Sequence, residues 1–79
     1  MSFFDWTEAF HIFMAVYLQK YPAEAPHLLK YMSIMKEIFE LRGNEAFQYY
    51  DETFRSIRKE HRQPWQVVIE DVYRKAMYM

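Results

Sequence analysis

The segment from Ala9 to Leu18 constrains the fold most, because nine of its ten residues are apolar and only His11 interrupts them. A helix of a small soluble protein normally carries one apolar stripe and one solvated face. The side chains that share one narrow arc at helical spacing are Trp6, Phe10, Phe13 and Tyr17. They form the expected core stripe, so the remaining apolar residues need cover from elsewhere.

The opposite side of this first helix carries Ile12, Ala15 and Leu18, next to His11. Two interpretations are open. Either the fourth helix or the N-terminal Phe3-Phe4 pair covers them within the chain, or they form a surface for a partner. We predict His11, Ile12, Ala15 and Leu18 as protein-interface residues.

The chain has one glycine and three prolines, and they all fall between amphipathic segments. Asp5 is a candidate N-cap, and Pro26 can open a helix at its first turn. Gly43 can end a helix in a left-handed conformation, with Asn44 as the next N-cap, and Pro64 begins the last segment. The pattern predicts an all-α, compact four-helix bundle with short loops and helices over about 5–20, 26–42, 44–61 and 64–78.

Seventy-nine residues indicate a single helical domain over 1–79. The chain has no cysteine, so disulfides and thiolate metal sites are excluded, and aromatic residues make up 20% of it. No secretion signal is apparent, and the apolar run at 9–18 is too short to cross a bilayer. We expect a soluble intracellular protein that does not enter the membrane.

Cationic side chains gather in the third predicted helix, although the net charge of the whole chain is only −1. Arg55, Arg58 and Arg62 follow one helical line, with Lys59 beside them. Such a stripe suits phosphate contacts, which need no sequence readout. Cations near a helix C-terminus also complement the helix dipole, and no aromatic platform interleaves the stripe in the sequence. Nucleic-acid backbone binding is therefore an alternative function.

The residues of catalysis and metal binding do not form a recognisable pattern. His11, His27 and His61 fall in three different elements without metal-ligand spacing. The acid pairs Asp51-Glu52 and Glu70-Asp71 are adjacent, and adjacent side chains diverge on a helix instead of sharing a proton. We expect no enzyme activity, no metal and no cofactor.

A series of anchor residues extends over roughly residues 6 to 65. The anchors are Trp6-x-Glu8-Ala9-Phe10, Tyr17, Tyr21-Pro22, Ala25-Pro26, Leu29, Tyr31, Gly43, Tyr50-Asp51, Phe54-Arg55 and Trp65. This order resembles a helical domain in gag-like proteins of tyrosine-recombinase-type (DIRS-like) retrotransposons. The resemblance implies a role in self-assembly or ribonucleoprotein organisation, although this chain lacks the Cys/His-rich segment that commonly follows in that family.

These observations favour a non-enzymatic interaction module that forms a homo-oligomer, with a homodimer as the first expectation. A groove for an amphipathic helix of another protein is a further alternative. The sequence does not distinguish that groove from self-association.

Overall fold

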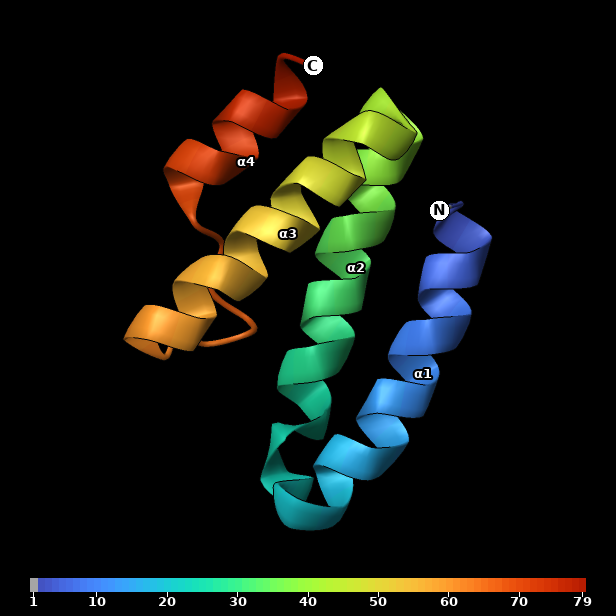
Figure 1. Cartoon of the computed structure of the whole chain (residues 1–79), viewed down its shortest axis with the longest axis vertical. Helices are drawn as coiled ribbons and strands as arrows, with labels where there is room; N and C mark the ends of the chain where they lie inside the picture. The colour runs from blue at the N-terminus through green and yellow to red at the C-terminus, as the bar shows by residue number, and fades with distance from the viewer. Residues whose placement is uncertain (1) are drawn as a thin grey trace.

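The computed structural model describes residues 2–79, which form four α-helices and one short 3-10 turn. The helices are α1 (Phe3–Lys20), α2 (Ala25–Arg42), α3 (Asn44–His61) and α4 (Glu70–Met77), and the turn is η1 (Pro22–Glu24). No strand occurs in this part of the chain. The predicted all-α helical bundle is therefore confirmed (Figure 1).

The N-terminus of α1 lies two residues before the predicted one. The Ser2 hydroxyl is the N-cap and accepts a hydrogen bond from the Asp5 backbone N–H at 3.1 Å. Asp5 is therefore not the cap. It lies inside the first turn, where its negative carboxylate interacts favourably with the positive end of the helix dipole.

The turn between α1 and α2 follows from the two prolines. The Glu24 backbone N–H donates to the Tyr21 carbonyl at 3.0 Å, which closes η1, and Pro26 occupies the first turn of α2. α1 and α2 consequently run antiparallel and side by side, with η1 at one end (Figure 1).

Gly43 alone separates α2 from α3. Its φ of 87° and ψ of −165° lie in a region that essentially only glycine adopts. Its N–H donates to the Phe39 carbonyl at 2.8 Å, and the same residue is the N-cap of α3. The prediction of Asn44 as the cap is wrong, because Asn44 is already helical.

The fourth helix begins at Glu70 and not at Pro64 as predicted. Residues 62–69 form a loop in which Arg62 has a left-handed φ of 54°. This loop places the Trp65 ring, which is only 3% exposed, among the rings of α1, α2 and α3. Burial of one indole therefore outweighs continuation of the helix, and α4 packs against α3 and α2.

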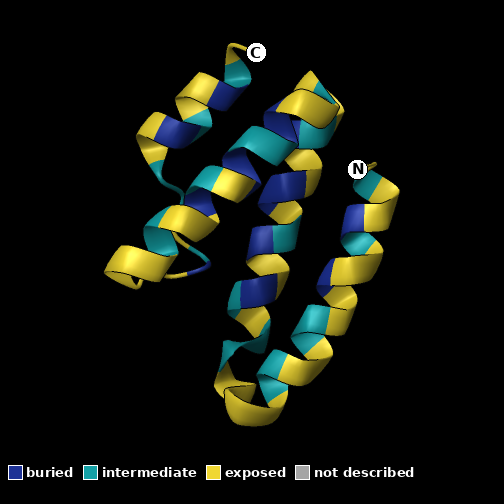
Figure 2. Cartoon of the chain, viewed as in Figure 1, coloured by how far each residue is buried: buried dark blue, intermediate teal, exposed yellow. Residues whose placement is uncertain are grey.

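The core lies where α1, α2 and α3 meet, and it is largely aromatic (Figure 2). Its largest fully buried side chains are Tyr31, Tyr50, Phe10, Phe47, Phe54, Leu28, Met35 and Ile38. Interlocked rings of this size each bury on the order of 150–250 Å². They allow a chain without disulfides to form one dense core.

Candidate functional site

Three of the four predicted interface residues of α1 are exposed in the structure. His11, Ile12 and Ala15 are exposed, whereas Leu18 is half-buried and packs against the core. Ile12 is 66% exposed, and so is Val16, one helical turn further along. The sequence interpretation missed Val16 because it counted residues directly opposite the core stripe and left out those to one side.

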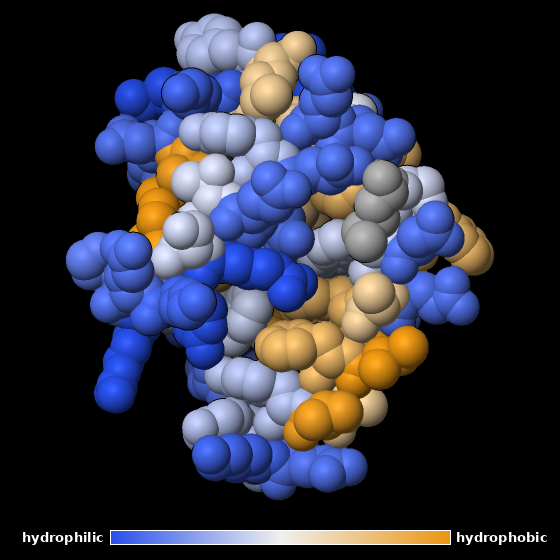
Figure 3. Space-filling model, in the orientation of Figure 1, coloured by the Kyte–Doolittle hydropathy of each residue, from blue (hydrophilic) through white to orange (hydrophobic). Residues whose placement is uncertain are grey.

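No other part of residues 2–79 covers this face of α1. α4 packs on α3 and α2, and the Phe3 ring turns inward to stack on Phe39 at 4.6 Å. Phe4 points outward and is itself 79% exposed. The two intramolecular covers considered from the sequence are therefore ruled out, and Figure 3 shows a hydrophobic patch over α1.

A buried carboxylate joins the first three helices. Asp51 in α3 is 8% exposed, and it accepts hydrogen bonds from Trp6 of α1 at 2.9 Å and from Tyr31 of α2 at 2.6 Å. Arg55, one turn along α3, donates to the same carboxylate at 2.9 Å. The four-residue spacing of Asp51 and Arg55 on a helix is visible in the sequence, but the other two donors are 45 and 20 residues away from Asp51.

The environment of Tyr31 keeps its hydroxyl neutral. Burial, followed by the negative charge of Asp51 and the hydrogen bond to it, raises the pKa of Tyr31 well above its ordinary value of 10.0. The hydroxyl therefore remains a donor to the carboxylate at neutral pH. We interpret this Asp51 network as a positioning device for three helices, because all its donors come from the protein itself.

The predicted basic stripe lies along a hollow of about 1180 Å³ that we call the basic groove. Arg55, Arg58 and Lys59 of α3 line one side of it together with Arg62, which lies just after the helix and not on it as predicted, and the end of α1 and the η1 turn line the other. Arg58 donates to the Tyr17 hydroxyl at 2.9 Å and to the Gln63 carbonyl. Its guanidinium lies 4.5 Å from the centre of the Trp65 ring, within the range of a cation–π contact.

The groove also contains aromatic side chains that the sequence did not indicate. Tyr17 and Tyr21 of the α1 end and Trp65 of the loop line it together with the cations. No aromatic residue interleaves the stripe in the sequence, and the rings beside it belong to other segments. Trp65 follows Arg62 closely in the sequence, but Tyr17 and Tyr21 come from a segment distant from α3, so only the fold brings those two rings to the cations.

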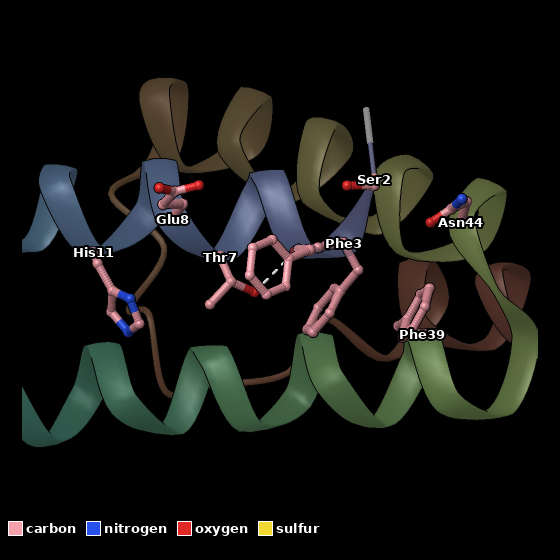
Figure 4. Close-up of a pocket in the computed structure, with 8 residues that line it drawn as sticks. Ser2, Phe3, Thr7, Glu8, His11, Phe39 and Asn44 are labelled. Carbon is pink, nitrogen blue, oxygen red and sulfur yellow. Dashed lines mark hydrogen bonds between the residues drawn. The ribbon is translucent and has the colours of Figure 1, made fainter.

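A second hollow, of about 680 Å³, lies between the N-terminal half of α1 and the C-terminal half of α2. Figure 4 shows the Phe3 and Phe39 rings side by side at its floor, with His11 at one end. The Thr7 hydroxyl donates to the Phe3 carbonyl at 2.9 Å, so this polar group is already satisfied. Phenylalanine rings form much of the lining of this hollow, and Thr7 lies between them and His11 (Figure 4).

Residues 2–79 contain no group of three or more histidine, aspartate or glutamate side chains that could hold a metal ion. None of the helices described here is both long and apolar enough to span a bilayer. No family model, curated relative or solved structure matches this chain.

Proposed function

We propose that this protein is a non-enzymatic helical interaction module that forms a homodimer through the outer face of α1. The observation that carries the proposal is the exposure of Ile12 and Val16, each 66%, on neighbouring turns of one helix. Burial of such a side chain is worth about 1.5–3 kcal/mol, so an uncovered pair favours association.

The geometry of α1 supports a symmetric contact. The helix has 18 residues and is therefore about 27 Å long. Two copies of such a helix can pack along their lengths, and each contact then occurs twice in a two-fold dimer. Ala9 and Ala15, both small and exposed, allow the two backbones to approach closely. A stable dimer requires about 1,000 Å² of buried surface, which the neighbouring side chains of α2 would help to supply.

We further propose a gag-like retroelement origin, based on the order of the anchor residues. Four of these anchors, Trp6, Tyr31, Asp51 and Arg55, form the Asp51 network. This convergence supports the pattern as the mark of a folded domain. These four residues then stabilise the fold, and self-assembly depends on other residues that are exposed.

The test is light scattering after size-exclusion chromatography over a series of protein concentrations. We expect a dimer for the wild type and a folded monomer for the double variant Ile12→Glu, Val16→Glu. The matched control is Leu41→Glu, Val67→Glu, which changes two other exposed apolar residues, 56% and 46% exposed, away from α1. The control variant should remain dimeric.

Circular dichroism of each variant separates a lost interface from a lost fold. A wild type that is monomeric at all concentrations would contradict self-association and favour an adaptor for a foreign helix. A double variant that stays dimeric would place the interface elsewhere on the molecule.

A further inference from the structure

The basic groove has a strong imbalance of charge. Its lining includes Lys20 of α1, the three cations of α3 and Arg62 of the following loop, against one carboxylate, Glu24. The Glu24 carboxylate of η1 lies 3.0 Å from Nδ1 of His27 in α2, so it already has a partner. An anion entering the groove therefore meets an excess of positive charge at short range.

Among the described residues, four of these five cations have no carboxylate partner, and of the four only Arg58 is held by hydrogen bonds to other groups of the fold, the Tyr17 hydroxyl and the Gln63 carbonyl. The ion pairs found in residues 2–79 are His27–Glu24, Arg55–Asp51 and His61–Glu60. Lys20, Lys59 and Arg62 take part in none of them, and all three are exposed. They can turn toward a phosphate without breaking a contact that the fold needs.

An accessible aromatic surface lies beside these cations. The Tyr21 ring is 45% exposed, and its centre is 4.9 Å from that of Tyr17. The Lys20 ammonium is 5.5 Å from the centre of the Tyr21 ring. A flat ring next to a cation suits a nucleotide, whose base can stack while its phosphate is neutralised.

The floor of the groove is held in place before any ligand arrives. Arg58 is fixed by Tyr17, Gln63 and Trp65, and Trp65 packs on Phe54 with ring centres 5.7 Å apart. A fixed floor lowers the ordering cost of binding.

We propose that the basic groove binds single-stranded nucleic acid, with Lys20, Lys59 and Arg62 contacting phosphates and Tyr21 stacking on a base. A duplex keeps its bases stacked on each other and gains nothing from the Tyr21 ring. An acidic peptide can pair with the cations but has no base for that ring. The groove does not include Ile12 or Val16, so this proposal and the dimer proposal can fail separately.

The first measurement is fluorescence anisotropy with labelled oligonucleotides of about 12 nucleotides, a length within the range of single-strand sites. Single-stranded RNA, single-stranded DNA and a duplex of the same sequence are compared. With three phosphates neutralised, log K should fall with log salt with a slope of about −2. Single-strand affinity should therefore fall on the order of 20-fold between about 50 and 200 mM salt.

Charge-reversal variants locate the site. Lys59→Glu, Arg62→Glu should weaken single-strand binding at least about tenfold and make the salt slope shallower. The matched control Lys36→Glu, Arg74→Glu makes the same change of charge at exposed residues outside the groove. It should lower the affinity much less.

Tyr21 variants test stacking separately from charge. Tyr21→Ala should weaken single-strand binding at least about fivefold, and Tyr21→Phe should restore it, because the ring and not the hydroxyl carries the contact. Thermal melts followed by circular dichroism establish that each variant is folded.

Four results would overturn the proposal. They are no single-strand binding at low salt, equal affinity for the duplex, equal competition by a polyglutamate peptide, and equal losses in the groove and control variants. Equal competition by the peptide would identify a general site for acidic chains.

Discussion

The two tryptophans of this protein are buried equally but held in different ways. Trp6 is 5% exposed, and its indole N–H donates to Asp51 at 2.9 Å. Trp65 is 3% exposed, and its indole N–H has no acceptor within residues 2–79. One ring is fixed by a directional hydrogen bond, and the other by ring packing and the Arg58 guanidinium.

This difference shows that directional hydrogen bonds set the positions of the helices, whereas ring packing fills the space between them. A hydrogen bond to a buried carboxylate tolerates little error in distance or angle, so the Asp51 network sets the relative positions of α1, α2 and α3. Ring packing accepts more than one arrangement of similar volume. The loop that carries Trp65 is therefore held by ring packing and by the contacts of Arg58, and not by a hydrogen bond of the indole.

The largest effect is expected from Asp51→Ala, which removes the centre of the network. The Trp6 N–H and the Tyr31 hydroxyl would each lose their buried acceptor, at about 1–3 kcal/mol apiece. The free energy of unfolding should therefore fall by about 3 kcal/mol or more, measured by urea titration. Asp51→Asn keeps one acceptor oxygen and should lose less. A loss below about 1 kcal/mol in the alanine variant would refute the assigned role of the network.

A matched pair of variants compares the two indoles directly. Trp6→Phe and Trp65→Phe remove the same atoms, but only Trp6→Phe leaves a carboxylate oxygen without its donor. Trp6→Phe should be the more destabilising by about 1–3 kcal/mol, measured as the difference between the two urea midpoints at constant slope. Equal losses would mean that ring packing alone holds both tryptophans.

The smallest effect concerns Tyr31 at high pH. Its raised pKa means that the unfolded chain loses the hydroxyl proton first, at about pH 10, while the folded protein keeps it. The stabilisation is therefore complete below pH 10 and decreases as the pH rises above it. Tyr31→Phe should show a shallower loss of stability than the wild type in this range.

Wild type and variant share the raised pKa values of Tyr50 and Tyr73, so their difference isolates Tyr31. Thermal melts of both proteins at several pH values between about 8 and about 11, a range that includes the ordinary tyrosine pKa, measure this difference in stability. Parallel curves for the two proteins would show that Tyr31 makes no contribution.

The parts of the fold that the sequence predicts are those set by local pattern. The apolar stripes of α2 and α3, the break at Pro22 and the end of α2 at Gly43 all follow from helical spacing and backbone preferences. The start of α4 does not, because residues 64–69 continue a plausible helical stripe. Their actual path is decided by burial of Trp65 against rings that lie elsewhere in the chain.

The candidate sites divide in the same manner. The spacing of Arg55, Arg58 and Arg62 already places them on one side of a helix, and the structure places them along one groove. Tyr21 joins them only because the end of α1 lies across the groove from α3, which no local pattern encodes. Asp51 shows no sign in the sequence of its two distant donors, because a buried carboxylate and a solvated one look alike there.

The single-residue connection at Gly43 has a consequence for how this architecture can vary. An α-helix turns about 100° and rises 1.5 Å per residue. One residue inserted into the last turn of α2 would therefore rotate all of α3 about the axis of α2. Asp51 would then face away from Trp6 and Tyr31. Changes of length are therefore not tolerable at the α2–α3 junction, where the register of the two helices is fixed.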